Sequence, residues 1–302
     1  MCGIVGLLIK NPSLRSSLGE LMVPMLIGMS QRGSDSAGLA IFTETLPDHQ
    51  RKYSLYSGSI HTGGNFNWLE LTQAFQTHFK TTPDLQVHGN QAVLTADLAP
   101  NVVKQWLQDH YPHIRLLSTG RAIDLYKDAG SPTSIADRYQ FKHLQGSHLV
   151  GHTRMATESA VTPAHAHPFT AGEDFCLVHN GSLSNPYEIR RKLEHHGIQF
   201  ETDNDTEAAC RFLEWRMQEG DDLKEAIQKG FEALDGFYTF LMGTANQLAL
   251  VRDAFACKPA VVAETDDYVA IASEFRSLAH LPHINHAHIY EPAPEEMYVW
   301  TV

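Results

Sequence analysis

The chain begins Met1-Cys2-Gly3-Ile4-Val5-Gly6-Leu7-Leu8-Ile9-Lys10, and this stretch decides how the rest of the sequence is interpreted. Residues 3–9 are a short apolar run rich in β-branched side chains, which predicts a fully buried strand. The chain therefore starts inside its own core, with a cysteine directly before that strand. No basic region precedes the run and no small-residue cleavage site follows it, so we expect a cytoplasmic protein without a secretory leader.

Composition limits the classes of function. The 302 residues are 43% hydrophobic and 19% charged, which suits one large or two ordinary globular domains. Acidic residues outnumber basic ones by 35 to 23, and the formal charge of -12 disfavours nucleic acid, because phosphate neutralisation needs a surplus of Lys and Arg. The longest apolar stretch, residues 21–29, contains Pro24 and is shorter than the roughly twenty residues of a bilayer span. No membrane span is therefore expected.

The cysteines and one pair of histidines are the candidate metal ligands of this chain. The four cysteines are Cys2, Cys176, Cys210 and Cys257. They are far apart and form no C-x-x-C pair, which argues against a disulfide framework and a structural zinc site. His165 and His167 form a His-x-His pair that can bind metal, but no third ligand is near in sequence. We therefore predict no metal site and expect that any important cysteine acts as a thiol.

Hydrophobic periodicity separates the first half of the chain into two parts. Residues 14–29 follow helical spacing, with Pro24 able to kink the helix, and a glycine-containing loop at 31–38 leads to a strand at 39–42. From Tyr53 to Gln145 the composition changes, and short β-like runs alternate with helical patterns. We predict a small inserted α+β subdomain over residues 53–145.

The second half predicts many strands and three helices. Strands are expected at 149–154, 175–179, 238–242, 248–251, 261–263 and 269–272. Helices are expected at 186–196, 206–218 and 223–234. The first of these helices has Asn185 as its expected N-cap, Pro186 at its first position and Glu188 placed for a capping box. Consecutive strands with clustered helices predict α+β layers and not alternating βαβ units.

Cys2 is the first candidate for chemistry. The initiator methionine is expected to be removed before a residue as small as cysteine, which leaves a thiol and a free α-amine on one residue. An α-amine has a pKa of about 8, so it can take the thiol proton and return it to a leaving amine. One residue then supplies both nucleophile and base, although a cysteine at position two is by itself an ordinary residue.

Three polar clusters could complete such a site. Arg154 follows an apolar run, where its guanidinium could hold a carboxylate through two hydrogen bonds, and the alternative is a surface ion pair. Asn180 and Gly181 offer a side-chain amide and a backbone N–H, the donors of an oxyanion hole, although Asn-Gly is also a frequent hairpin turn. Asp205 is either the N-cap of the next helix or a partner for a substrate ammonium. Together Arg154 and Asp205 would hold an amino acid while Cys2 attacks its side chain.

These motifs occur in the order seen in a known family. They are residues 1–6, Arg32-Gly33 with Asp35 and Gly38, Gly151-His152-Thr153-Arg154, His167-Pro168, His179-Asn180-Gly181 and Asn204-Asp205-Thr206-Glu207. In them the chain resembles class II glutamine amidotransferases, which are N-terminal-nucleophile (Ntn) hydrolases. The motifs are most similar to those of the glutaminase domain of glucosamine-6-phosphate synthase. This resemblance continues into Arg252-Asp253, Lys258-Pro259 and Ala272-Ser273-Glu274.

The resemblance implies a role for each main candidate. It implies that Cys2 is the nucleophile and that Asn180 and Gly181 are the oxyanion donors. Arg154 would bind the α-carboxylate of glutamine, and Asp205 its α-ammonium. Attack on the side-chain amide would give a thioester and ammonia, and water would then release glutamate.

Further residues are implied at the glutamine pocket. Thr157 and His167 would contact or line it, and Arg32 would hold the loop near the nucleophile. The residue after the substrate arginine, often aromatic in the family, is Met155 in this chain.

The resemblance also implies an architecture and partners. The fold would be a four-layer αββα Ntn-hydrolase sandwich over residues 2–302, and L-glutamine would be the substrate. Because the motifs extend almost to the last residues, we expect the ammonia acceptor on a separate synthase subunit. Among stand-alone chains the sequence resembles the glutamate-synthase-like group, including the amidotransferase subunit of N-methylglutamate synthase, which implies FMN and an iron–sulfur cluster in the partner.

No cofactor is expected in this chain itself. Two alternative functions stay open at this point. One is a free-standing Ntn amidase that acts on another amide, and the other is a non-catalytic regulatory module of the same fold.

Overall fold

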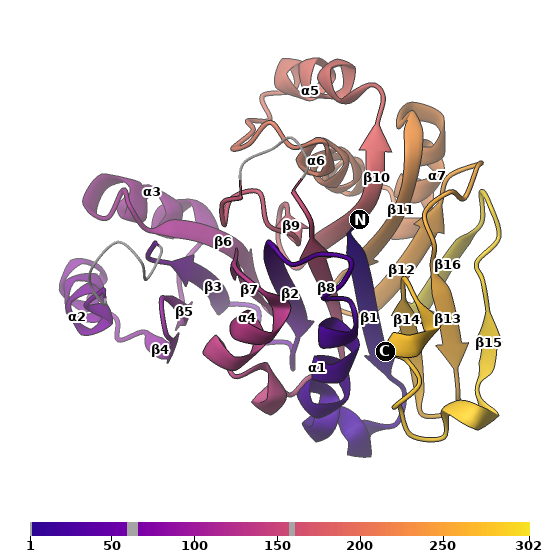
Figure 1. The fold of residues 1–302 in the computed structure, drawn as a ribbon. Coiled ribbons are helices and arrows are strands. Elements are labelled where there is room, and N and C mark those ends of the chain that lie inside the picture. The colour runs from indigo at the N-terminus through magenta and orange to yellow at the C-terminus, as the bar shows by residue number, and fades with distance from the viewer. Residues whose placement is uncertain (1, 59–65, 157–160) are drawn as a thin grey trace.

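The computed structural model describes residues 2–58, 66–156 and 161–302, and its strands form three antiparallel sheets (Figure 1). The members of the largest sheet are β1 (Gly3–Ile9), β2 (Ser36–Phe42), β7 (Ile123–Ala129), β8 (His148–Arg154), β13 (Val261–Glu264), β14 (Tyr268–Ala272) and β15 (His288–Tyr290). Their order is β15-β13-β14-β1-β8-β2-β7. The first strand of the chain therefore lies in the middle of the sheet.

A second sheet packs face to face on the first. Its members are β9 (Phe169–Thr170), β10 (Cys176–Leu183), β11 (Gly236–Gly243), β12 (Gln247–Arg252) and β16 (Met297–Thr301). Their order is β16-β12-β11-β10-β9. The outer face of this sheet is covered by α5 (Pro186–His195), α6 (Asp205–Gln218) and α7 (Leu223–Ala233). The outer face of the first sheet is covered by α1 (Leu18–Gly28) and α4 (Pro132–Arg138).

Alternation along β1 explains why this strand is buried on both faces. Val5 and Leu7 point into the core beneath α1, whereas Ile4 and Leu8 point into the core between the two sheets. Successive side chains of a strand face opposite sides, so a continuous apolar run suits a strand with cores on both sides. The two sheets and their outer helices form the expected four-layer αββα sandwich, which is confirmed.

A third, smaller sheet lies beside the sandwich and projects from it in Figure 1. Its members are β3 (Arg51–Tyr56), β4 (Asp84–His88), β5 (Gln91–Ala96) and β6 (Arg115–Gly120), in the order β4-β5-β3-β6. It packs against α2 (Trp68–Phe79) and α3 (Pro100–His110) around its own aromatic core, in which Phe75 meets Trp106 edge to face.

The separate sheet occupies only part of the span 53–145 that composition singled out. Within that span, β7 pairs with β2 in the large sheet, and α4 packs with α1. We call β3 to β6 with α2 and α3 the inserted layer, residues 51–120.

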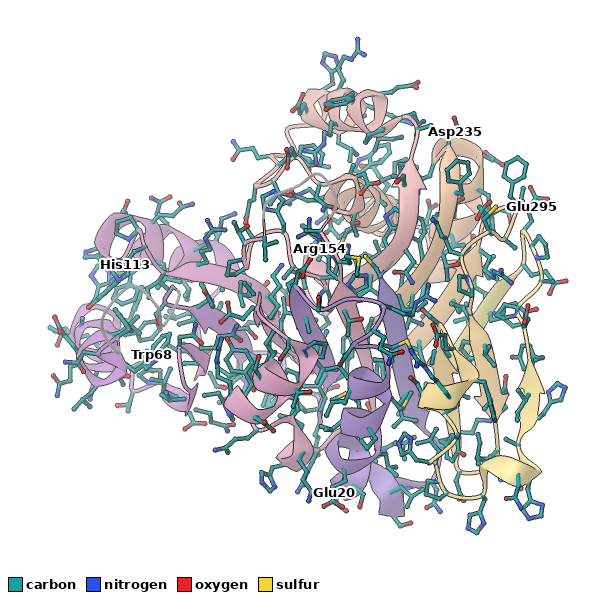
Figure 2. All side chains as sticks on the ribbon, in the orientation of Figure 1. Glu20, Trp68, His113, Arg154, Asp235 and Glu295 are labelled. Carbon is teal, nitrogen blue, oxygen red and sulfur yellow. The ribbon has the colours of Figure 1, made fainter. Side chains whose placement is uncertain are left out.

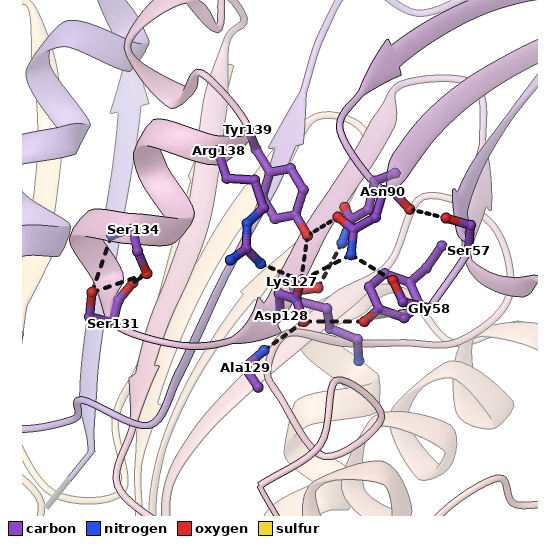
Figure 3. A network of polar contacts seen from close by, with 12 residues as sticks. Ser57, Gly58, Asn90, Lys127, Asp128, Ala129, Ser131, Ser134, Arg138 and Tyr139 are labelled. Carbon is purple, nitrogen blue, oxygen red and sulfur yellow. Dashed lines mark hydrogen bonds and ion pairs between the residues drawn. The ribbon is translucent and has the colours of Figure 1, made fainter. Parts of the chain in front are cut away.

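A buried carboxylate joins the inserted layer to the sandwich (Figure 3). Asp128, on β7, accepts hydrogen bonds from the hydroxyl of Tyr139 at 2.9 Å, from Nδ2 of Asn90 at 3.1 Å and from the hydroxyl of Tyr56 at 3.2 Å. Arg138 pairs with the same carboxylate at 2.7 Å. Because Tyr56 and Asn90 belong to the inserted layer, Asp128 fixes that layer against β7 and α4.

Two local predictions about helix starts are wrong. Asn185 makes no capping bond at the start of α5. Its side chain instead accepts from the backbone N–H of Asp235 at 3.1 Å and donates to the carbonyl oxygen of Ala233 at 2.9 Å, so a tertiary contact replaces the expected capping box. At α6 the N-cap is Asn204, which accepts from the N–H of Thr206 at 2.9 Å, and not Asp205.

The first helix is shorter than its hydrophobic spacing indicates. It begins at Leu18, and the residues before it form a 3-10 helix, Pro12–Ser17, whose N-cap is Asn11. Pro24 lies inside α1. Among the described residues, further short 3-10 helices are Phe141–His143, Phe275–Ser277 and Ile284–His286. Within the described residues, we find no helix with the length and apolar character needed to cross a membrane.

Candidate active site

Cys2 lies directly before β1, between the neighbouring strands β8 and β14. Its carbonyl oxygen accepts hydrogen bonds from Nε of Arg32 at 2.9 Å and from Nδ2 of Asn180 at 3.3 Å. Its Sγ lies 3.9 Å from the carbonyl oxygen of Met155 and is partly exposed. Three distant segments of the chain therefore meet at this cysteine.

Arg32 contacts the nucleophile candidate itself. Its guanidinium also pairs with Glu274 at 2.8 Å, and this hydrogen bond lowers the pKa of the Glu274 carboxyl. The side chain of Arg32 is 10% exposed. It ties the start of β1 to the segment after β14.

Ser273 also contacts this site, although the sequence motif that contains it predicted no role for it. Its Oγ accepts from the N–H of Ile4 at 3.0 Å and from Nδ2 of Asn180 at 3.2 Å. The signal available in the sequence is its position directly after the buried strand β14. Only the pairing of β14 with β1 makes that position part of the site.

Arg154 ends β8 and is 5% exposed, which does not fit the alternative of a surface ion pair. Figure 2 shows it at the end of the large sheet. Its carbonyl oxygen accepts from the N–H of Asp35 at 3.0 Å, and the carboxylate of Asp35 accepts from the N–H of Ala156 at 2.9 Å. Asp35, in the loop before β2, therefore fixes the backbone from Arg154 to Ala156.

Asn180 and Gly181 lie within β10, so the hairpin-turn alternative is wrong. They pair with Thr239 and Tyr238 of β11, and the strand continues to Leu183. Gly181 has a φ of +141°, and a Cβ at this position would collide with the carbonyl oxygen of Phe237. Only glycine fits there without strain.

Asp205 is the first residue of α6, and its carboxylate accepts from the N–H of Leu183 at 2.9 Å. Its other oxygen lies 3.7 Å from Nδ1 of His179, and the side chain is 27% exposed. Burial raises the pKa of this carboxyl, but the nearby His179 ring and the N–H groups of Leu183 and Thr206 outweigh this effect and lower the pKa below its usual value. Asp205 is therefore an anion at neutral pH, partly open to a cationic group.

Thr157 and His167 are the remaining candidates for the glutamine pocket. Thr157 lies outside the described residues. His167 is 5% exposed, and its Nε2 is 2.9 Å from Oγ1 of Thr206. His165 instead faces Asp203 at 3.0 Å, so the two histidines of the His-x-His pair have different partners. Within the described ranges no group of three or more His, Cys, Asp or Glu side chains is arranged to hold a metal ion, and the four cysteines are free.

Comparison with known proteins gives the family. The model of a glutamine amidotransferase domain matches residues 152–280. The chain is 45% identical over 300 residues to GlxB, a glutamine amidotransferase-like protein of Rhizobium meliloti, and the match covers 99% of this chain and 98% of that protein. A second relative, from Methanothermobacter thermautotrophicus, is 30% identical over 100% of both chains.

A solved structure shares the fold. The glutamine phosphoribosylpyrophosphate amidotransferase from B. subtilis has a TM-score of 0.62 at 17% identity, and the match covers 99% of this chain but 47% of that one. At this identity the likeness concerns the fold alone, and the chain spans about half the length of that enzyme. The two full-length relatives show that the chain belongs to the glutamine amidotransferases, and its αββα sandwich is the fold of the class II, or Ntn-type, members.

Proposed function

We propose that this amidotransferase hydrolyses the side-chain amide of glutamine through a thioester on Cys2. The thiol sulfur attacks the amide carbon, and the thiol proton passes to the α-amine that removal of Met1 exposes. That proton then goes to the leaving nitrogen, so the C–N bond breaks and ammonia departs. Water attacks the thioester, the C–S bond breaks, and glutamate and the thiol are restored.

The observation that carries this proposal is the convergence of three segments on Cys2. Arg32 and Asn180 hold its carbonyl oxygen, and Sγ remains partly exposed beside the backbone of Met155. A nucleophile needs this combination, because its backbone must be fixed while its reacting atom stays accessible.

The substrate roles belong to the same proposal. Nδ2 of Asn180 and the N–H of Gly181 would stabilise the oxyanion that forms on the amide carbonyl. Arg154 would hold the α-carboxylate of glutamine and the ionised Asp205 its α-ammonium. Thr157 and His167 are proposed as further contributors to the pocket.

For the ammonia, we propose transfer to a separate synthase subunit. The match to the R. meliloti protein accounts for 98% of that protein, whereas the B. subtilis enzyme carries about as much chain again outside the matched part. The partner chemistry we propose is that of a glutamate-synthase-like system, such as N-methylglutamate synthase, with FMN and an iron–sulfur cluster on the partner.

A glutaminase assay tests the catalytic part. Ammonia and glutamate release should fall below detection in Cys2→Ala, because the variant has no nucleophile. Cys257→Ala is the matched control, since Cys257 is an exposed free thiol, and it should retain the activity of the parent. Mass measurement should show a chain that lacks Met1. Absence of glutamine hydrolysis by the parent chain, alone and with its copurifying partner, would contradict the proposal.

Two further outcomes separate the alternatives. Faster hydrolysis of another amide than of glutamine would favour the free-standing amidase. Copurification from the native cell tests the partner, which should bring down a protein with flavin absorbance and bound iron and sulfide. A partner without these groups would contradict the glutamate-synthase-like part and leave the glutaminase part standing.

A further inference from the structure

His152 is a fully buried histidine next to the proposed oxyanion hole. It lies on β8, opposite Ile4 of β1, and none of its surface is exposed. Its Nε2 is 3.2 Å from the carbonyl oxygen of His179 and 3.3 Å from Oδ1 of Asn180. Its Nδ1 has no hydrogen-bond partner in the described part of the chain.

These contacts decide which ring nitrogen carries the proton. Burial lowers the pKa of His152 to about 3, so the ring is neutral near pH 7 and has a single N–H. A backbone carbonyl oxygen can only accept a hydrogen bond, so the nitrogen that faces the His179 carbonyl must be the protonated one. His152 therefore donates from Nε2, and the same N–H reaches Oδ1 of Asn180.

The orientation of the Asn180 amide follows from this donor. An asparagine oxygen and nitrogen have nearly the same shape, so the hydrogen-bond partners decide which end points where. On one side His152 offers a donor, and on the other the carbonyl oxygen of Cys2 offers an acceptor at 3.3 Å. Both partners select the orientation in which Nδ2 faces Cys2.

We infer that His152 is a positioning residue for the reaction at Cys2: its Nε2–H holds the oxygen of the Asn180 amide and thereby keeps the amide nitrogen on the side of Cys2. The inference rests on the proposed role of Asn180 as oxyanion donor. It accounts for a histidine two residues before Arg154, to which the roles assigned so far give no task.

The ring of His152 is itself held in place. It stacks on His167 with ring centroids 4.2 Å apart and an interplanar angle of 25°. Nε2 of His167 contacts Oγ1 of Thr206, the residue after Asp205. The stack therefore connects the donor of the Asn180 amide to the start of α6, where the proposed ammonium ligand lies.

Two substitutions at His152 separate the donor from the ring. His152→Phe keeps a flat ring for stacking but has no N–H, whereas His152→Gln keeps an amide donor near the position of Nε2. We expect kcat to fall about 10- to 100-fold in His152→Phe with KM within about threefold, because the donor acts on the transition state and not on substrate binding. His152→Gln should recover most of kcat.

A double-mutant cycle tests whether the effect passes through Asn180. In an Asn180→Ala background, His152→Phe should cause no further loss of kcat, because the group it positions is gone. Equal losses of kcat in both backgrounds would overturn the inference, as would a parental kcat in a folded His152→Phe protein. Thermal unfolding of every variant shows whether the fold is retained.

A separate readout does not depend on activity. ¹⁵N NMR of the histidine side chains distinguishes a protonated Nε2 from a protonated Nδ1. A protonated Nε2 on His152 is expected, and a protonated Nδ1 would overturn the inference even in a chain that does not hydrolyse glutamine. Failure of the inference and failure of the proposed glutaminase activity are thereby distinguishable, because the first shows in the tautomer and the second in the parent assay.

Discussion

The sandwich and the inserted layer both pack helices on an antiparallel sheet, but they are assembled from different sequence distances. In the sandwich, β1 pairs with β8 and with β14, so residues from the start, the middle and the end of the chain become neighbours. In the inserted layer, β3 to β6 pair with one another within residues 51–120. Every described candidate site residue lies in the sandwich.

The difference shows where a chain can vary without losing its chemistry. A site built from distant segments depends on the register of several strands at once. A unit whose contacts are local can be accommodated in a connection at a small entropic cost. The chain leaves the sandwich and returns to it at nearly the same place. On the two sides of the inserted layer, the N–H of Thr43 donates to the carbonyl oxygen of Ala122 at 2.9 Å, next to the β2–β7 pair.

The strongest test of the comparison is Asn180→Ala in the sandwich. Loss of one oxyanion donor costs about 10²- to 10³-fold in kcat in enzymes of this chemical type. We expect that loss with KM little changed, measured by steady-state glutaminase kinetics. A kcat within threefold of the parent would remove Asn180 from the catalytic machinery.

Lys127 tests whether β7 behaves as part of the sandwich core. Its ammonium is buried and donates to the carbonyl oxygens of Ala166 at 2.9 Å and Pro168 at 3.1 Å. Burial lowers its pKa from the usual 10.5 to about 8. Between pH 8 and 10.5 Lys127 is protonated in the unfolded chain but largely neutral in the folded protein, so the free energy of unfolding should rise with pH. Below about pH 8 Lys127 is charged in both states, and the folded protein bears the full penalty for the buried charge.

Relative to Lys127→Met, the parent should therefore gain about 3 kcal/mol of stability as the pH rises from about 8 to 10.5. Denaturant unfolding of both proteins at each pH measures the difference. Parallel profiles of the two proteins would show that Lys127 titrates as it does in the unfolded chain, which would contradict its burial.

Asn90→Ala makes the same chemical change as Asn180→Ala, but in the inserted layer. Asn90 donates to Asp128 and to the carbonyl oxygen of Gly58, and it accepts from the hydroxyl of Tyr139. Its loss leaves buried groups without a partner, so we expect a fall of about 1–3 kcal/mol in the free energy of unfolding. Its kcat should equal that of the parent. A loss of kcat comparable to that of Asn180→Ala would show that the two regions are not separable.

Removal of the whole inserted layer is the broadest test of whether the layer and the site are separable. Phe42 pairs with Ile123, so a two-residue Asn-Gly turn in place of residues 44–121 can close β2 and β7 into a hairpin. The melting temperature should fall because packing against the layer is lost, but kcat/KM for glutamine should stay within about tenfold of the parent. Loss of activity in a variant that retains near-UV circular dichroism would place the layer in the active site.

Much of the site could be predicted because it depends on the identity of a few residues. The continuous apolar run at residues 3–9 predicts that β1 is a strand with both faces buried. The cysteine directly before this run is also evident from the sequence. Helices α6 and α7 follow from their apolar periodicity. A hairpin turn at Asn180-Gly181 stayed open as an alternative because the same dipeptide fits a turn and a strand, and only pairing with β11 distinguishes them.

Other errors have the same origin in long-range contacts. Asn185 has the composition of an N-cap, but its side chain is used between α5 and the end of α7. The end of the inserted layer could not be located from composition, because β7 resembles the short strands before it and differs only in pairing with β2. Ser273 could be quoted as part of a motif but not given a role, because its partners Ile4 and Asn180 are remote in sequence.

The sequence by itself determined which chemistry is available: a thiol directly before a buried strand, an amide followed by glycine, and one arginine and one aspartate for the two charges of an amino acid. These follow from residue types and local hydrophobic pattern. The tertiary structure decided how those groups meet, because strand register and the direction of each hydrogen bond depend on residues from about 30 to 180 positions apart. The neutral donor at His152 that orients Asn180 is a property of that packing, since burial sets its charge and its neighbours select its tautomer.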